Sequence, residues 1–315
     1  MKRFLYILPL IAAVFACASC TKEVSTAVSE DEVTVSLSAL LPSVMETKAI
    51  AKAENTDVVY YEVWNEDWSV RLFPAADGQT LSAGVTGKQA AIDLTLVRSK
   101  TYNMIFWAQS SSFDGYDVSD LRYVKVDYSK FEGNQDCYDA FYAVKKITVT
   151  GTFKETVYLR RPFAQLNFGA TRMTSSLGPV VLGASEVKVS QLATSFDTRE
   201  GVGEDVIENV RFVAEGNATD ELLETEGKTY TWVSMNYMLM SGQKDAVTVT
   251  ASFEEKSVDA DVVHIVRNVP LQRNHRTNVI GDLFTGDAQL IVNKLYFIRR
   301  FIRTVYCVVL WIKIL

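Results

Sequence analysis

The residues best suited to chemistry lie near the N-terminus, in the segment Ala16-Cys-Ala-Ser-Cys20. Small side chains directly before Cys20 leave room for a signal peptidase, and the thiol of Cys20 can accept a diacylglyceryl group. The upstream chain agrees with this, because Lys2 and Arg3 are basic and residues 4–15 form an apolar run too short to span a bilayer permanently. We predict that residues 1–19 are a lipoprotein signal peptide and that Cys20 carries the lipid, with Cys17 as a minor alternative.

The residues that follow Cys20 indicate where the protein is sent. Thr21-Lys-Glu23 resembles the short charged signals that direct lipoproteins of the Bacteroidetes to the cell exterior. We therefore expect a lipid-anchored, surface-exposed protein of the cell outer membrane. We predict that residues 20–32 form a tether, and the alternative for Thr21-Lys-Glu23 is that it is only a polar part of this tether.

Side chains suited to metal binding or catalysis are scattered along the rest of the chain. Neither His264 nor His275 has further ligands at metal-binding spacing. The carboxylates of Asp114, Asp117 and Asp120 could surround a calcium ion, but they lack the EF-hand spacing, and we favour a solvated turn. The chain contains no nucleophile elbow, P-loop or dinucleotide fingerprint. We predict no enzymatic activity, no metal and no cofactor.

Aromatic side chains form a second group of binding candidates. Tyr60, Tyr61, Trp64 and Trp68 lie on and beside one predicted strand, and exposed aromatic rings can stack on sugars. Because neighbouring residues of a strand point to opposite faces, at least half of these rings should belong to the core. The candidate stacking residues are Tyr61, Trp64 and Trp68.

Charge and cysteine content exclude other classes of protein. The formal net charge of −6 leaves no excess of positive charge to neutralise a phosphate backbone, so nucleic acid is not an expected partner. Downstream of Cys20 only Cys137 and Cys307 remain, and one pair is not a disulfide framework. We expect Cys137 to be an unpaired thiol on a turn.

Most of the chain has the pattern of short strands. Residues 33–41 alternate apolar and small polar side chains, as a strand with one buried face does. No stretch keeps a helical period between two caps. Many short strands without intervening helices predict an all-β fold of antiparallel β-sandwiches. The other predicted strands are 58–64, 91–97, 102–108, 123–128, 146–150, 156–159, 186–190, 230–234, 246–253 and 262–266.

A domain boundary is predicted near residue 160. The segment Leu159-Arg-Arg-Pro-Phe163 interrupts the apolar pattern, and Pro162 cannot lie in a central strand. Division here gives two halves of ordinary domain size. We predict an N-terminal sandwich over residues 33–160 and a C-terminal sandwich over residues 161–292.

Several segments resemble the fimbrillin-like proteins of the Bacteroidales. Residues 157–168, Val-Tyr-Leu-Arg-Arg-Pro-Phe-Ala-Gln-Leu-Asn-Phe, are similar to the segment that opens the second domain in that family. Thr47-Lys-Ala49, Asp139-Ala-Phe-Tyr142 and Arg276-Thr-Asn-Val-Ile-Gly-Asp-Leu283 resemble further family features. The resemblance covers residues 30–292 and implies two tandem transthyretin-like, Greek-key domains in a lipoprotein that is a pilus subunit or a related surface protein.

The resemblance also implies a mechanism of assembly. In polymerising members, a protease cuts after a basic residue and removes the first strand, and a strand of the next subunit then fills the groove. In this chain the removable strand is 33–41 and the basic residue is Lys48, where the family favours arginine. The partners would be further copies or other pilin-like subunits. Alternatively, residues 33–41 stay in place as an edge strand and residues 47–55 form a surface loop.

The last segment, residues 293–315, differs in composition from the rest. It contains five basic residues and no acidic residue, and its apolar stretch 304–312 is too short to span a membrane. We interpret it as a membrane-surface anchor, an inserted terminal strand, or an aberrant end left by a frame shift or truncation.

Two hypotheses of function follow. The first is a structural or adhesive component of a pilus, as subunit, anchor or tip accessory, that acts by strand addition. The second is a monomeric surface lipoprotein that holds a glycan or another host ligand.

Overall fold

The computed structural model describes residues 31–42, 55–73, 80–256, 260–285 and 290–296. Its regular structure is almost entirely β-strand, with short 3-10 turns at η2 (Tyr128–Lys130) and η3 (Asp136–Tyr138). This confirms the predicted all-β, sandwich-type fold class. In the described ranges, no helix has the length and apolar character needed to cross a bilayer.

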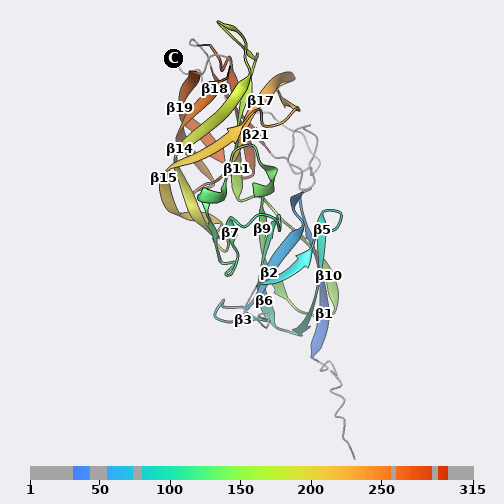
Figure 1. The fold of residues 1–315 in the computed structure, drawn as a ribbon. Helices are drawn as coiled ribbons and strands as arrows, with labels where there is room; N and C mark the ends of the chain where they lie inside the picture. The colour runs from blue at the N-terminus through green and yellow to red at the C-terminus, as the bar shows by residue number, and fades with distance from the viewer. Residues whose placement is uncertain (1–30, 43–54, 74–79, 257–259, 286–289, 297–315) are drawn as a thin grey trace, which may run out of the picture.

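The lower lobe in Figure 1 is a sandwich of two sheets around one apolar core. One sheet has the strand order β10-β1-β5, and the other has the order β3-β2-β6-β9 with β4 also paired to β2. Both sheets contribute apolar side chains to the core between them. The strands are β1 (Glu32–Leu40), β2 (Val58–Asn65), β3 (Arg71–Leu72), β4 (Leu81–Gly84), β5 (Gln89–Val97), β6 (Thr101–Gln109), β9 (Phe141–Thr148) and β10 (Phe153–Tyr158).

The upper lobe in Figure 1 is a second, larger sandwich. One of its sheets has the order β16-β17-β11-β20-β21, and the other has the order β19-β18-β14-β8-β7 with β15 paired to β14. A small hairpin, β12 (Thr174–Ser175) with β13 (Gly178–Pro179), follows β11. The other strands are β7 (Tyr116–Asp117), β8 (Tyr123–Val126), β11 (Phe163–Ala170), β14 (Leu182–Asp197), β15 (Val202–Glu215), β16 (Leu222–Thr225), β17 (Lys228–Leu239), β18 (Lys244–Glu255), β19 (Ala260–Gln272), β20 (His275–Gly281) and β21 (Ile291–Tyr296).

A crossing segment between β6 and β9 joins the two lobes. It leaves the first sandwich after β6, adds β7 and β8 to a sheet of the second, and returns as β9. Phe113, Tyr116, Phe131 and Tyr138 of this segment are 5–8% exposed and belong to the second core. Division of the chain at residue 160, between β10 and β11, remains a prediction. The crossing segment precedes residue 160 in the sequence, but its aromatic side chains pack in the core of the second lobe.

Strand β1 is central in its sheet, so the expectation that it lies at an edge is wrong. It pairs antiparallel with β5 on one side and parallel with β10 on the other. Strand β11 has the same arrangement, antiparallel to β17 and parallel to β20. Among the described strands, each sandwich therefore contains one parallel pair, which a purely antiparallel prediction did not include.

Several strands were not among those predicted from local pattern, and β15 and β21 are two of them. Strand β15 pairs with β14 along almost its whole length, although Glu204 to Asn209 are exposed on both faces and show no alternation. Strand β21 pairs with β20, so the first residues of the segment 293–315 continue a regular strand. Residues 297–315 lie outside the described ranges.

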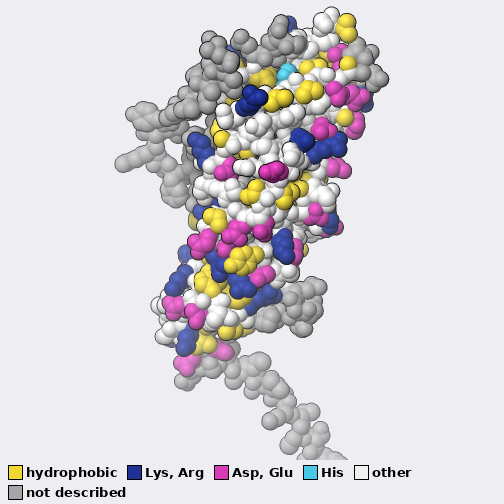
Figure 2. All heavy atoms as spheres, turned by 90° about the vertical axis from the view of Figure 1, so that its left-hand side faces the viewer, with side chains coloured by type: hydrophobic (Ala, Val, Ile, Leu, Met, Phe, Trp, Pro, Cys, Tyr) yellow, Lys and Arg dark blue, Asp and Glu magenta, His cyan; other side chains and the backbone are white. Residues whose placement is uncertain are grey.

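The face of the molecule drawn in Figure 2 carries acidic and basic side chains next to one another. Hydrophobic side chains on this face lie in small groups between the charged ones. The face drawn there therefore has no extended area of a single charge sign.

Candidate functional site

The candidate site is built around strand β1, which supplies one wall of the first core. Its inward residues alternate along the strand, and Val35, Leu37 and Ala39 are at most 2% exposed. Its outward face includes the small polar residues Thr34, Ser36 and Ser38. The alternation that predicted a half-buried strand is therefore present in the fold.

The two neighbours of β1 depend on it for their backbone pairing. Nine residue pairs join β1 to β5, and six join it to β10. No other strand of the described chain pairs with β5 or with β10. Without β1, both strands would expose unpaired N–H and C=O groups along an apolar groove.

The apolar contribution of β1 is large compared with the stability of a typical domain. Val33, Val35 and Leu37 of β1, and Leu41 directly after it, are each at most 7% exposed. Full burial of such a side chain stabilises by about 1.5–3 kcal/mol, so the four together contribute roughly 6–12 kcal/mol. A whole domain is commonly stable by only about 5–15 kcal/mol. The first sandwich therefore needs this position to be filled, by β1 or by an equivalent strand.

Two predicted site residues, Cys20 and Lys48, lie outside the described residues. The described chain resumes at residue 55 and leads into β2. Lipidation at Cys20 and cleavage at Lys48 therefore remain predictions.

The predicted stacking residues are placed differently from one another. Trp64 is 5% exposed, its Nε1 donates to Glu62 Oε2 at 2.8 Å, and the Arg122 guanidinium lies 4.0 Å from its ring centre. That ring therefore offers no face to a sugar. Tyr61 is partly buried against the first core. Trp68 is also partly exposed and lies 6.4 Å from Trp64 between ring centres.

Trp68 has an unusual backbone conformation, with a φ of 64°. Bulky side chains rarely adopt the left-handed region. Hydrogen bonds of the β2–β3 turn hold it, because Asn65 Oδ1 accepts from Val70 N–H and Asp67 Oδ1 accepts from Ser69 N–H. Of the three predicted stacking residues, Trp68 is therefore held at a turn with part of its surface exposed.

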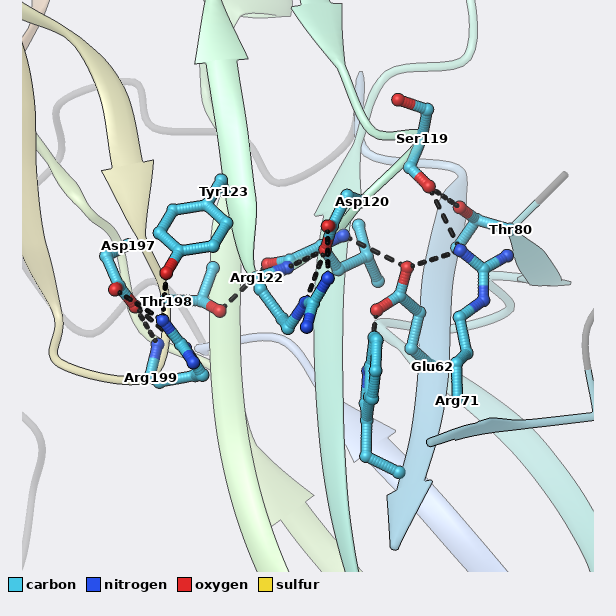
Figure 3. A network of polar contacts seen from close by, with 12 residues as sticks. Glu62, Arg71, Thr80, Ser119, Asp120, Arg122, Tyr123, Asp197, Thr198 and Arg199 are labelled. Atoms are coloured by element: carbon cyan, nitrogen blue, oxygen red, sulfur yellow. Dashed lines mark hydrogen bonds and ion pairs between the residues drawn. The ribbon is translucent and has the colours of Figure 1, made fainter. Parts of the chain in front are cut away.

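A polar network centred on Glu62 connects the first sandwich to the crossing segment (Figure 3). The buried carboxylate of Glu62 accepts from Leu121 N–H at 3.1 Å and from Arg71 Nη1 at 3.0 Å. Burial raises the pKa of Glu62, and these hydrogen bonds oppose the shift. Thr198 Oγ1 in turn donates to the Leu121 carbonyl at 2.8 Å. The network thus links β2 to the end of β14 in the second lobe.

A second buried cluster lies where three of the segments that carry the family resemblance meet. Arg161 donates from Nε and Nη2 to the Asp139 carboxylate at 2.8 Å, and both side chains are at most 5% exposed. Tyr237 Oη donates to Asp136 Oδ1 at 2.9 Å, and burial raises the pKa of Asp136 to about 6. Burial also lowers the pKa of Arg276 to about 10. These charges hold the crossing segment against β11, β17 and β20.

The remaining chemical candidates have local structural partners. Asp114 pairs with Lys130 at 2.7 Å, Asp117 accepts from the backbone N–H and the hydroxyl of Ser119, and Asp120 pairs with Arg122. Within the described ranges, no group of three His, Cys, Asp or Glu side chains has metal-binding geometry. The three aspartates therefore belong to hydrogen-bonded turns.

The histidines and the internal cysteine also have defined places. His264 Nε2 lies 2.6 Å from the Leu283 carbonyl, and His275 is the first residue of β20. Cys137 is a free thiol in η3, and partial burial raises its pKa. A buried thiol with a raised pKa is a poor nucleophile.

Sequence reasoning did not identify Glu62 or β10 as parts of a site. A single glutamate between Tyr61 and Val63 gives no signal that its carboxylate joins two lobes. The pairing of β1 with β10 joins residues more than a hundred positions apart, which strand periodicity cannot reveal.

The comparisons with known proteins fall into three groups. A family model described as a family of unknown function (DUF6562) matches residues 25–294. No curated protein matches the chain. Among solved structures, a protein of Porphyromonas gingivalis, the tip fimbrial protein Mfa3 with a C-terminal truncation, is 10% identical with a TM-score of 0.47, covering 84% of this chain and 99% of its own.

Two structures from Bacteroides are similar to the same extent. One, from Bacteroides thetaiotaomicron, is provisionally described as polysaccharide-binding (DUF1812); it is 14% identical with a TM-score of 0.49, covering 85% of this chain and 98% of its own. The other, from Bacteroides ovatus, is provisionally described as a cell adhesion protein; it is 12% identical with a TM-score of 0.48, covering 84% of this chain and 98% of its own.

Proposed function

Since this chain belongs to DUF6562, a family of unknown function, we propose a function from its own geometry: it is a structural or adhesive component of a cell-surface pilus that assembles by strand addition. In this proposal Cys20 anchors the newly exported chain in the outer membrane. Cleavage after Lys48 then releases β1 from the folded body. A strand of another copy, or of another pilin-like subunit, takes its place.

The arrangement of β1 is the observation that supports this proposal. The strand is central, its inward face is apolar, and the middle of its outward face consists of small polar residues. Its removal would leave a groove with two unpaired strand edges and an apolar floor, and an incoming strand would satisfy both. The cleavage candidate Lys48 lies between β1 and β2 in the sequence, so a cut there separates β1 from the rest of the chain.

A strand-replacement experiment tests the proposal. We would replace residues 45–48 of the full chain with the recognition site of a sequence-specific protease, cleave it, and add a labelled peptide of residues 31–42. Stable incorporation of the peptide, and ladders of the cleaved protein on unheated denaturing gels, are the expected results. A cleaved protein that retains its own β1 and stays monomeric contradicts the proposal.

The peptide itself provides a matched pair of controls. A Leu37→Asp peptide would place a carboxylate at a position that is 2% exposed, so it should fail to be incorporated. A Ser36→Asp peptide has the same added charge on the outward face and should be incorporated as the original is. Equal incorporation of both peptides would show that the groove does not recognise the strand.

The second candidate is a monomeric surface lipoprotein that binds a glycan through Trp68. Its partly exposed ring, held at a hydrogen-bonded turn, is the observation that favours it. Saturable glycan binding that is lost in Trp68→Ala but retained in Tyr61→Ala would support this function. Intact mass spectrometry of the protein from cells separates the two candidates, because it detects both the lipid on Cys20 and cleavage at Lys48.

A further inference from the structure

Strand β19 is the last strand of its sheet in the second lobe (Figure 1). In the part of the chain that the structure describes, β18 pairs with it on one side and no strand pairs with it on the other. Its residues Ala260 to Val266 keep an unbroken register with β18. Strand β15, which pairs with β14 alone, is irregular at Asp205 and Asn209, whose φ values are 52° and 60°. Of these two outer strands, β19 therefore has the more regular free edge.

The outward face of β19 carries two large apolar side chains between two opposite charges. Val263 and Ile265 are 56% and 63% exposed. Asp261 precedes them and Arg267 follows them at the spacing of one strand face, and both are exposed. Ser252 Oγ donates to Asp261 Oδ2 at 3.1 Å, which holds that carboxylate over the sheet. Apolar side chains along an unpaired strand edge favour pairing with another chain.

The order of these four side chains is complementary to itself when two copies of β19 run antiparallel. With His264 opposite its own counterpart, Asp261 lies opposite Arg267 of the second copy, and Val263 lies opposite Ile265 of the second copy. A two-fold axis repeats each contact, so the apolar side chains lie between ion pairs. Cross-strand pairs of both kinds stabilise antiparallel sheets. A parallel pairing in the same register would instead place Asp261 opposite Asp261 and Arg267 opposite Arg267.

The inward residues of β19 are compatible with this register. Val262 would lie opposite Val266 of the second copy, which joins two apolar side chains of the same core layer. His264 Nε2 lies 2.6 Å from the carbonyl of Leu283, a fully buried residue. This contact keeps the imidazole against its own lobe, so the ring does not block the free edge.

We infer that β19 pairs antiparallel with β19 of a second copy of this chain, so that one continuous sheet passes through a closed, symmetric dimer. Asp261 and Arg267 select the antiparallel register, and Val263 and Ile265 supply the apolar surface that the dimer buries. This inference goes beyond the proposed function, because each copy keeps its own β1. The dimer requires neither cleavage at Lys48 nor strand exchange.

The test measures the mass of the uncleaved full chain in a non-denaturing detergent by sedimentation equilibrium. We expect a reversible dimer. Asp261→Arg and Arg267→Asp each place like charges opposite one another, and each alone should weaken dimerisation by about tenfold or more. A mixture of these two variants places arginine opposite aspartate at every charged position, so it should form a mixed dimer. Lys188→Asp, exposed on the outward face of β14, is the matched control and should dimerise as the unmodified chain does.

An unmodified chain that stays monomeric at every concentration would overturn the inference and leave the β19 edge to a different partner. Dimers that neither charge variant weakens, or charge variants that do not combine when mixed, would overturn it as well. Ile265→Thr keeps the charges and removes apolar surface, so it should weaken the dimer severalfold; it decides if a charge variant does not fold. Thermal unfolding of each variant shows that it is folded. Ladders on unheated denaturing gels report exchange of β1 separately, so the two proposals can fail independently.

Discussion

Strands β1 and β11 hold the same place in the two sandwiches. Each is central, with one antiparallel and one parallel neighbour. Their sheets differ, because β5 and β10 end the β1 sheet, whereas β17 and β20 of the β11 sheet pair further with β16 and β21. Loss of β1 would divide a sheet into two single strands, whereas β11 is held within a sheet of five.

The side chains of the two strands differ even more. All eight residues of β11 are buried, and two of them are amides, Gln165 and Asn167. Asn167 Nδ2 donates across the sheet to Asn278 Oδ1 at 2.8 Å, which fixes the pairing with β20. Strand β1 buries only one face and has no buried polar side chain. The same topology therefore holds one strand that is buried on a single face and another that is buried on both faces.

The largest expected effect on the β11 side comes from the buried ion pair at its start. Asp139→Ala leaves Arg161 buried without its carboxylate, which should lower the free energy of unfolding of the second lobe by about 3–5 kcal/mol. Urea denaturation followed by tryptophan fluorescence measures the loss. A loss below 1 kcal/mol would mean that water reaches this cluster freely.

A core truncation in β1 should cost slightly less and should affect the first sandwich. Leu37→Ala removes a side chain that is 2% exposed, with an expected loss of about 2–5 kcal/mol. Ser36→Ala, on the outward face of the same strand, should change stability by less than about 0.5 kcal/mol. Hydrogen exchange, read separately for β5 and β17, shows which lobe responds. Equal loosening of both would show that the lobes unfold as one unit.

A pH-dependent effect of intermediate size is expected around β11. Burial raises the pKa of Asp136 from an unfolded value near 3.8 to about 6, so the folded protein binds more protons between these values. This contribution to stability is present below about pH 4 and is lost as the pH rises through about 6, by roughly 2–3 kcal/mol. Asp136→Asn should remove that slope and be more stable than the unmodified chain at pH 7.5. Denaturation curves at pH 4.5, 6 and 7.5 measure the free energy of unfolding. An increase of this free energy with pH would contradict the prediction, because it would mean that the fold stabilises Asp136 as a carboxylate.

The smallest effect is expected from an exposed ion pair on the first sandwich. Lys146 and Glu66 lie 2.9 Å apart, but their side chains are 59% and 63% exposed. Lys146→Ala should therefore cost less than about 1 kcal/mol, and high salt should reduce the difference. A larger loss of stability that persists in high salt would contradict this prediction, because a screened, exposed ion pair could not account for it.

Much of the fold could be predicted from local pattern. The alternation in residues 33–41 gave β1 within a residue at each end, and the break at Pro162 lies between β10 and β11. The position of β1 at the centre of its sheet could not be predicted, because its parallel neighbour β10 is distant in sequence. Strand β15 was not predicted, because the exposed segment from Glu204 to Glu208 shows no alternation of buried and exposed residues. In the structure the strand is defined by its pairing with β14.

The candidate sites were less predictable than the strands. The aromatic content of β2 pointed to Trp64, but the burial of its ring under Arg122 depends on the crossing segment. The motifs that contain Asp139, Arg161 and Arg276 were noticed as separate segments, and only the fold places them in one charged cluster.

The double pairing of β1 also has a mechanical consequence. A force applied to the N-terminal end of β1 acts along the strand axis, at right angles to the hydrogen bonds that join it to β5. The ladders to β5 and β10 then share the load in shear and must fail together, whereas a force across the sheet would open them one pair at a time. A chain tethered through the segment before β1 would therefore carry its load on both ladders at once.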